Sequence, residues 1–163
     1  MPRQPHELFD SREQKAELEA RNGLLQFEAI RQMVDESRNG FEFTQASLCE
    51  LQRLVIQDIY TCAGNLRTRP VYIMRNGVVD HSQHQPPAPA LIPALVSDFC
   101  QYINSNFGKS SAVHLSAYAM WRINWIHPFM GGNGRTSRGA AYLLLNVRMG
   151  VQFARRQHYR SAN

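Results

Sequence analysis

The sequence predicts a mainly α fold, a helical bundle with one β-hairpin, and three observations support this prediction. Apolar residues recur at helical spacing in five separate segments. One further segment combines β-branched and aromatic residues with a tight-turn signal. Hydrophobic residues make up 44% of the 163 positions and only 8 are proline, so we expect residues 1–163 to form a single compact domain with its own core.

The first two helices are expected in the N-terminal third of the chain. Residues 11–34 are rich in good helix formers, and their apolar side chains line one face. Thr44 can cap a second helix, in which apolar residues again recur on one face. We expect this second helix to stop near residues 63–64.

Three more helices are expected in the second half of the chain. Residues 90–104 and 112–126 are dominated by apolar side chains. The second of these segments is apolar around most of its circumference, which predicts a buried central helix. Residues 136–149 form the last predicted helix, and Gly150 is its stop signal.

One segment has the character of a β-hairpin. Residues 71–79 carry β-branched and aromatic side chains on both sides of Asn76 and Gly77, a pair that tolerates the positive φ angles of a tight turn. The apolar residues of this hairpin are Val71, Tyr72, Ile73, Val78 and Val79. The prolines of residues 84–90 then interrupt regular structure, because each fixes φ and lacks an N–H.

The composition argues against several classes of protein. Cys49, Cys62 and Cys100 are too few and too far apart for a disulfide framework, and no Cys-x-x-Cys pair indicates structural zinc. No apolar run approaches the roughly 18 to 20 residues that span a bilayer, and the polar first residues do not form a signal peptide. We therefore expect a cytoplasmic protein with no membrane partner.

The charge balance leaves two interpretations open. Eighteen Lys and Arg against thirteen Asp and Glu give a net charge of +5, and sixteen of the eighteen cations are arginine. Because the guanidinium binds phosphate or carboxylate with two parallel hydrogen bonds, nucleotide or polyanion binding is one interpretation. A merely basic surface is the other. We expect no specific nucleic-acid partner.

The most informative segment is residues 126–138, Ile-His-Pro-Phe-Met-Gly-Gly-Asn-Gly-Arg-Thr-Ser-Arg. Its glycines permit sharp turns and a close approach of a ligand to main-chain N–H groups. The loop opens the last helix, whose N-terminus favours phosphate. Arg135 and Arg138 project from one side of the first turn, where cations are unfavourable unless an anion binds. The segment therefore predicts an anion site.

Histidine and phenylalanine side chains precede the glycines of this loop. His127 can act as a general base near neutral pH, and Phe129 is expected to point into the core. A structural histidine packed beside Trp125 is the alternative interpretation of His127. His84 and His114 each stand alone, so we expect them to have structural roles.

These residues match the motif of the Fic family, His-Pro-Phe-x-(Asp/Glu)-Gly-Asn-Gly-Arg-x-x-Arg, at every fixed position but one. Residues 63–67, the hairpin at 71–79 and residues 120–126 also look like this family. The resemblance covers most of the chain. It implies a Fic-type helical bundle with one β-hairpin flap over the active site, and a catalytic and anion-binding loop at residues 127–138.

The resemblance also implies an activity. Fic proteins usually transfer AMP from ATP to a Ser, Thr or Tyr hydroxyl of a target protein and release pyrophosphate. Carried over by position, His127 would be the catalytic base. The residues that would hold the phosphates are Gly132, Asn133, Gly134, Arg135 and Arg138. The flap would pair its main chain with that of the target.

Gly131 is the departure from the family pattern. The family has Asp or Glu at this position, and that carboxylate holds the Mg²⁺ that bridges the phosphates. With no carboxylate here the protein ligand of Mg²⁺ is missing, so the resemblance implies a weak adenylyltransferase or none. Asp80 is another acid that could substitute, although nothing in the sequence brings it near.

The chain also lacks the family's inhibitory motif, (Ser/Thr)-x-x-x-Glu-(Gly/Asn). Either a small inhibitory protein supplies the glutamate, as in a toxin–antitoxin pair, or the enzyme is unrestrained, or weak activity makes restraint unnecessary. Two other functions stay open. One is a non-catalytic domain that binds nucleotide or a partner protein. The other is transfer of a different phosphate-containing group, although kinase-type relatives carry Lys where this chain has Gly134.

Overall fold

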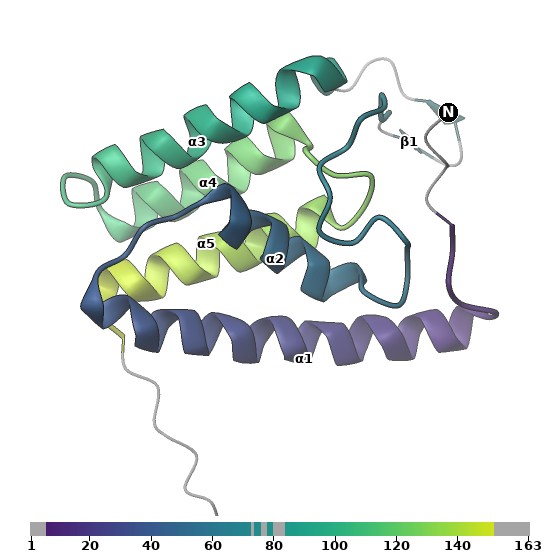
Figure 1. The fold of residues 1–163 in the computed structure, drawn as a ribbon, viewed down its shortest axis with the longest axis horizontal. Helices are drawn as coiled ribbons and strands as arrows, with labels where there is room; N and C mark the ends of the chain where they lie inside the picture. The colour runs from purple at the N-terminus through teal and green to yellow at the C-terminus, as the bar shows by residue number, and fades with distance from the viewer. Residues whose placement is uncertain (1–5, 73, 76–77, 80–83, 152–163) are drawn as a thin grey trace, which may run out of the picture.

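The computed structural model describes residues 6–72, 74–75, 78–79 and 84–151. Over these residues the structure is mainly helical, as the sequence predicts (Figure 1). In chain order the elements are α1 (Arg12–Glu36), the 3₁₀ helix η1 (Ser37–Asn39), α2 (Gln45–Ile56), β1 (Met74–Arg75), β2 (Val78–Val79), the 3₁₀ helix η2 (Pro89–Leu91), α3 (Ile92–Asn106), α4 (Ala112–Ile126) and α5 (Asn133–Met149).

Hydroxyl side chains start three of the helices. Ser11, Thr44 and Ser111 have extended backbones, and each accepts a hydrogen bond from the N–H three residues further on. Such a cap satisfies one of the unpaired N–H groups of the first turn and contributes about 1 kcal/mol. The predicted cap at Thr44 is confirmed.

The predicted end of the second helix at residues 63–64 is wrong, because α2 stops at Ile56. Gln57 is extended, with ψ of 143°, and Asp58 has a left-handed backbone with φ of 60°. This reversal buries Ile59 completely. The apolar spacing continued through the turn, so periodicity alone placed Ile59 on the helix.

The central helix of the bundle is α5, not α4 as predicted. Figure 1 shows α5 between α1 on one side and the α3–α4 pair on the other, and it packs against α1, α2 and α4. The segment of α4 is apolar around most of its circumference, but it leaves Trp121 57% exposed and Met120 45% exposed. In α5, Gly139 lets α1 approach closely, since a Cβ there would lie 2.7 Å from the side-chain nitrogen of Gln26.

A short antiparallel strand pair falls within the predicted hairpin. In β1 and β2, Met74 pairs with Val79 and Arg75 with Val78, which leaves residues 76–77 between them. Val71 and Tyr72 precede β1 and are not in a strand, so the regular part is shorter than predicted. Ile73 and residues 76–77 lie outside the described residues, and a flap role for this hairpin stays a prediction.

No helix in the described part of the chain is both long enough and apolar enough to cross a bilayer.

Candidate active site

The loop has two residues with a left-handed backbone, one at each side of the α4–α5 connection. His127 ends α4 with φ of 50° and ψ of 59°, and Gly132 precedes α5 with φ of 77° and ψ of 2°. A Cβ on Gly132 would lie 2.7 Å from Cγ2 of Ile56 on α2, so packing excludes any side chain there. Glycine is thus required by both conformation and space.

Two hydrogen bonds hold His127 through its nitrogen atoms. Its N–H donates to the carbonyl of Ile123 at 2.8 Å, and its Nδ1 lies 3.3 Å from the carbonyl oxygen of Asn124. A carbonyl oxygen only accepts, so Nδ1 carries the proton of the neutral ring. This tautomer leaves the lone pair on Nε2, the atom that can accept a proton from a substrate.

The surroundings keep the imidazole neutral. Burial is the main cause that lowers the pKa of His127 below its ordinary value, and electrostatic interactions with Arg67 and with His84 lower it further. The hydrogen bond to Asn124 acts in the opposite direction and is outweighed. A neutral imidazole at neutral pH is the form that a general base needs.

The side chain of Asn133 stabilises the loop itself. Its Oδ1 accepts from the N–H of Phe129 at 3.0 Å, and its Nδ2 donates to the carbonyl of Phe129 at 2.8 Å. Asn133 is 3% exposed and Phe129 is fully buried, which confirms that Phe129 points into the core. Because both ends of this amide are bonded to Phe129, the side chain of Asn133 holds the loop.

The first turn of α5 presents open main-chain donors. The first intrahelical bond runs from the N–H of Thr136 to the carbonyl of Gly132, and Gly132 has no side chain to cap the turn. The N–H groups of residues 133–135 therefore have no intrahelical acceptor. Such a helix N-terminus binds anions through these N–H groups and the helix dipole.

The two arginines of this turn differ in their contacts. Arg135 forms an ion pair with Glu19 of α1, with Nη2 3.3 Å from Oε1, and both side chains are partly exposed. Its Nη1 is buried and has no hydrogen-bond partner among the described residues. Arg138 is exposed, and its Nη1 would lie 3.5 Å from a Cβ placed on Gly134. The guanidinium of Arg138 therefore lies close to the open N–H groups, whereas that of Arg135 is paired with α1.

Gln52 ties the loop to α2, a contact that the sequence did not predict. Gln52 is fully buried, donates to the carbonyl of Gly131 at 3.1 Å and accepts from the N–H of Gly64 at 2.5 Å. A buried amide in an amphipathic helix face was the available signal, but nothing in the sequence gives its partners.

The residues at Gly131 do not fit a Mg²⁺ ion held by a protein carboxylate. Gly131 has no side chain, its carbonyl accepts from Gln52, and the described residues contain no group of three or more His, Cys, Asp and Glu that could hold a metal. Asp80 lies outside the described residues. The position itself has room, since a Cβ on Gly131 would meet nothing within 4 Å and its φ is not in the left-handed region.

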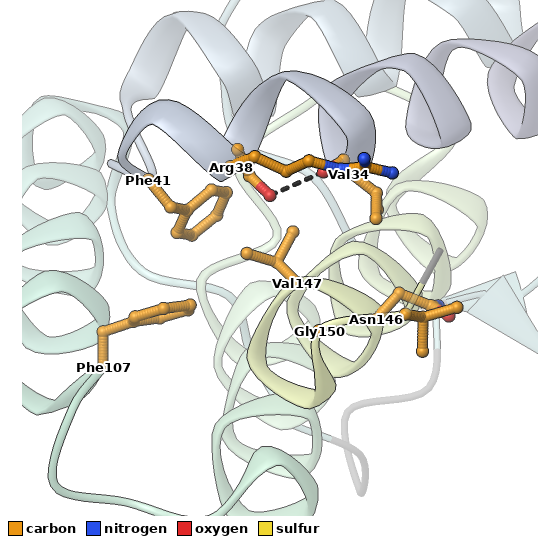
Figure 2. A pocket seen from close by; sticks show the side chains of 9 residues that line it. Val34, Arg38, Phe41, Phe107, Asn146, Val147 and Gly150 are labelled. Atoms are coloured by element: carbon orange, nitrogen blue, oxygen red, sulfur yellow. Dashed lines mark hydrogen bonds between the residues drawn. The ribbon is translucent and has the colours of Figure 1, made fainter. Parts of the chain in front are cut away.

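A cavity of about 430 Å³ lies at the other end of α5 (Figure 2). Its lining residues are Val34, Ser37, Arg38, Phe41, Phe107, Asn146, Val147, Gly150 and Val151. The 17 residues of α5 span about 25 Å, so this cavity is separate from the loop. Apolar and polar side chains both line it, among them Phe41, Phe107 and Arg38.

The fold and the loop together define a class: a helical bundle that places a histidine with a lowered pKa beside a helix N-terminus whose first N–H groups are uncapped. The chain belongs to the Fic/DOC family, whose sequence profile matches residues 42–145. This range includes the whole loop and most of the helices that hold it.

Relatives named as adenylyltransferases share part of the sequence. The chain is 34% identical over 108 residues to a protein adenylyltransferase Fic from Drosophila persimilis. The matched segment covers 65% of this chain and 19% of that protein. The same enzyme from Drosophila willistoni is 33% identical over the same length. The chain thus spans about a fifth of the length of these relatives.

Solved structures share the fold. A Fic domain containing signaling protein from Bacteroides thetaiotaomicron superposes with a TM-score of 0.64 at 25% identity, over 81% of this chain and 47% of that one. A Fic family protein from Desulfovibrio desulfuricans gives a TM-score of 0.66 at 21% identity, over 85% of this chain and 38% of that one. The second likeness shows the fold alone.

Proposed function

We propose that this chain transfers AMP from ATP to a hydroxyl side chain of a target protein, with His127 as the catalytic base. The single observation that supports this best is the bond between Nδ1 of His127 and the carbonyl of Asn124, which leaves Nε2 as the proton acceptor. Relatives named protein adenylyltransferase, at 33–34% identity, support this choice of reaction class and donor.

The proposed step uses groups of this chain together with ATP. Nε2 of His127 takes the proton of a Ser, Thr or Tyr hydroxyl, and the oxygen attacks the α-phosphorus of ATP. The bond between the α-phosphorus and its bridging oxygen to the β-phosphate breaks, and pyrophosphate leaves. The target is left with an AMP ester, and the proton resides on His127 until solvent removes it.

The phosphates are assigned to the start of α5. Main-chain N–H groups of Gly132, Asn133 and Gly134 surround the α- and β-phosphates in this proposal, and Arg135 and Arg138 bind the outer ones. Support for this assignment comes from the uncapped first turn and from the guanidinium of Arg138, which lies close to Gly134. Charge-assisted hydrogen bonds of this kind strengthen as pyrophosphate separates and gains charge.

In this proposal the hairpin of this chain binds the target protein. A target segment would add its main chain beside β1 or β2, with Val71, Tyr72, Ile73, Val78 and Val79 as the docking residues. The exposed side chain of Tyr72, at 61%, supports a contact role for this region.

Glu19 is a group of this chain that would restrain the binding of ATP. Its carboxylate pairs with Arg135, so an incoming phosphate must displace it or share the guanidinium. This contact reduces the need for a small inhibitory protein that supplies a glutamate, although such a partner stays part of the proposal. The pair is partly exposed, so the restraint is expected to be modest.

The test is transfer of label from ATP to protein. Incubation with a cell lysate and Mg²⁺ or Mn²⁺ should label protein bands from ATP labelled at the α-phosphate and not from ATP labelled at the γ-phosphate. Label from γ-phosphate would indicate phosphoryl transfer. Absence of both, with ATP binding retained, would leave the chain as a binding domain.

A non-catalytic nucleotide-binding domain is the second candidate function, and the features around Gly131 favour it. The acid of the family motif is absent, and the nearby carbonyl is already bonded to Gln52. Such a domain would signal by occupancy, with ATP bound at the same helix N-terminus. It predicts ATP binding that changes partner affinity without any covalent label.

A further inference from the structure

Arg67 is a buried arginine that bonds to the main chain of the candidate base, His127. It lies in the segment between α2 and β1 and is 3% exposed. Its Nε donates to the carbonyl of His127 at 2.7 Å, and its Nη2 donates to the carbonyls of Pro87 at 2.7 Å and Ile126 at 3.4 Å. The sequence showed this residue only as part of a segment that looks like the family, with no role.

The remaining contacts of Arg67 also end on main-chain carbonyls, and we call this set of hydrogen bonds the clamp. Its Nη1 donates to the carbonyl of Arg69 at 3.0 Å, and its own N–H donates to the carbonyl of Pro128 at 2.8 Å. Among the described residues, every hydrogen bond of its side chain ends on a main-chain carbonyl. Two of these carbonyls, at Ile126 and His127, belong to the end of α4, where the helix dipole favours a cation.

The backbone that Arg67 holds is one that a histidine rarely adopts. A left-handed conformation costs a residue with a Cβ about 1–2 kcal/mol, so the surroundings must stabilise it. The bond from Arg67 to the carbonyl of His127 acts on the residue whose φ is 50°. The same backbone sets where the ring lies and lets Nδ1 reach Asn124.

We propose that Arg67 is a positioning residue for the base: its guanidinium fixes the left-handed main chain of His127 and thereby the ring position that puts the free lone pair on Nε2. This proposal rests on the proposed function only in naming His127 as the base. The geometry of the clamp is independent of whether AMP is transferred.

The charge of Arg67 adds an effect on protonation. Arg67 and His84 both lower the pKa of His127, while the half-buried Arg135 and the exposed Arg138 stand on the neighbouring first turn of α5. A lower pKa keeps the ring neutral to more acidic pH. Loss of the charge at Arg67 therefore raises the pKa of His127 and moves the acidic limb of an activity profile to higher pH.

The test follows the ring nitrogens of His127 by ¹⁵N NMR in the full chain, with the His127 signals assigned by comparison with H127A. The wild type should show the Nδ1–H tautomer. Arg67→Met should lose this preference and raise the pKa of His127. Arg67→Lys keeps the charge but cannot reproduce the fork of bonds, so it should lose the tautomer preference with a smaller pKa change.

Kinetics provide the second readout where transfer is observed. Both variants should lower kcat by roughly 10- to 100-fold, as expected for a misplaced catalytic group, and leave ATP affinity within about twofold. Arg38→Met is the matched control, because Arg38 lies at the far end of α5 and pairs with the exposed Asp35. It should change neither the ring tautomer nor kcat.

The outcomes separate the two proposals. A wild type that binds ATP without transferring AMP contradicts the proposed function, and the NMR result still decides the role of Arg67. Folded Arg67→Lys protein with the wild-type tautomer and wild-type kcat overturns the positioning role. If Arg67→Met does not fold, the comparison of Arg67→Lys with the wild type decides the role of Arg67.

Discussion

The two ends of α5 both carry a left-handed glycine, yet the two positions serve different purposes. Gly150 has φ of 65°, its N–H caps the last turn by bonding to Asn146 and Val147, and a Cβ there would meet nothing within 4 Å. Gly132 has φ of 77° and no room for a Cβ, and the turn that follows it is left uncapped. A helix end that satisfies its own main chain is structural, whereas an open one is suited to a ligand.

The largest expected effect is on the free energy of unfolding, and it is measured by replacing each of these two glycines with alanine. Gly150→Ala meets only the backbone cost of the left-handed region and should lower the free energy of unfolding by about 1–2 kcal/mol. Gly132→Ala adds a clash with Ile56, so its loss should reach about 2–5 kcal/mol. Urea unfolding of both variants measures the difference, and equal losses would mean that the loop is not packed against α2 as described.

The arginines at the start of α5 should dominate nucleotide affinity. Arg135→Ala or Arg138→Ala should weaken ATP binding by about 1.5–3 kcal/mol each, because a hydrogen bond to a charged group is lost. Lysine at either position should restore only part of it. Calorimetry is the measurement, with Arg148→Ala in the last turn of α5 as the matched control. Unchanged affinity in both alanine variants would move the nucleotide site elsewhere.

A carboxylate introduced at position 131 should increase activity at the start of α5 and so widen the difference between the two ends of this helix. Gly131→Asp should raise Mg²⁺-dependent transfer about tenfold, equivalent to about 1.4 kcal/mol. The variant should fold normally, since a Cβ there meets nothing and the backbone is not left-handed. Gly131→Asn has the same shape without the charge and should give no gain. A folded Gly131→Asp protein that also gives no gain would favour the binding-domain function.

The smallest effect concerns the ion pair between α1 and α5. Glu19→Gln removes the carboxylate that pairs with Arg135 and should raise ATP affinity two- to fivefold, or about 0.4–1 kcal/mol, because the pair is partly exposed. Glu13→Gln, in the first turn of the same helix, is the control. A drop in affinity for Glu19→Gln would show that the contact supports the site instead of restraining it.

The sequence predicted the helices and the loop because each depends on local patterns. Apolar spacing located α1, α3, α4 and α5, and the motif located the α4–α5 connection. It placed the end of α2 too late, because a turn that buries Ile59 keeps helical spacing. It also made α4 central, since an apolar helix surface does not reveal that Trp121 stays exposed.

The contacts that hold the site could not be predicted, because they join distant segments through main-chain atoms. Arg67 and Gln52 bond to carbonyls that carry no sequence signature. The carbonyl at Gly131 and the side chain of Asn133 are both occupied within the loop, which a motif alone does not show. Residue types fix which groups are present, and tertiary packing fixes which of them are free.

The most direct test of the central claim is AMP transfer by His127→Ala, measured beside its ATP affinity in the same preparation. The proton acceptor acts on the target hydroxyl and not on the phosphates, so transfer should fall below detection while ATP affinity stays within about twofold of wild type. A His127→Ala protein that labels target at the wild-type rate would contradict the assignment of His127 as the base.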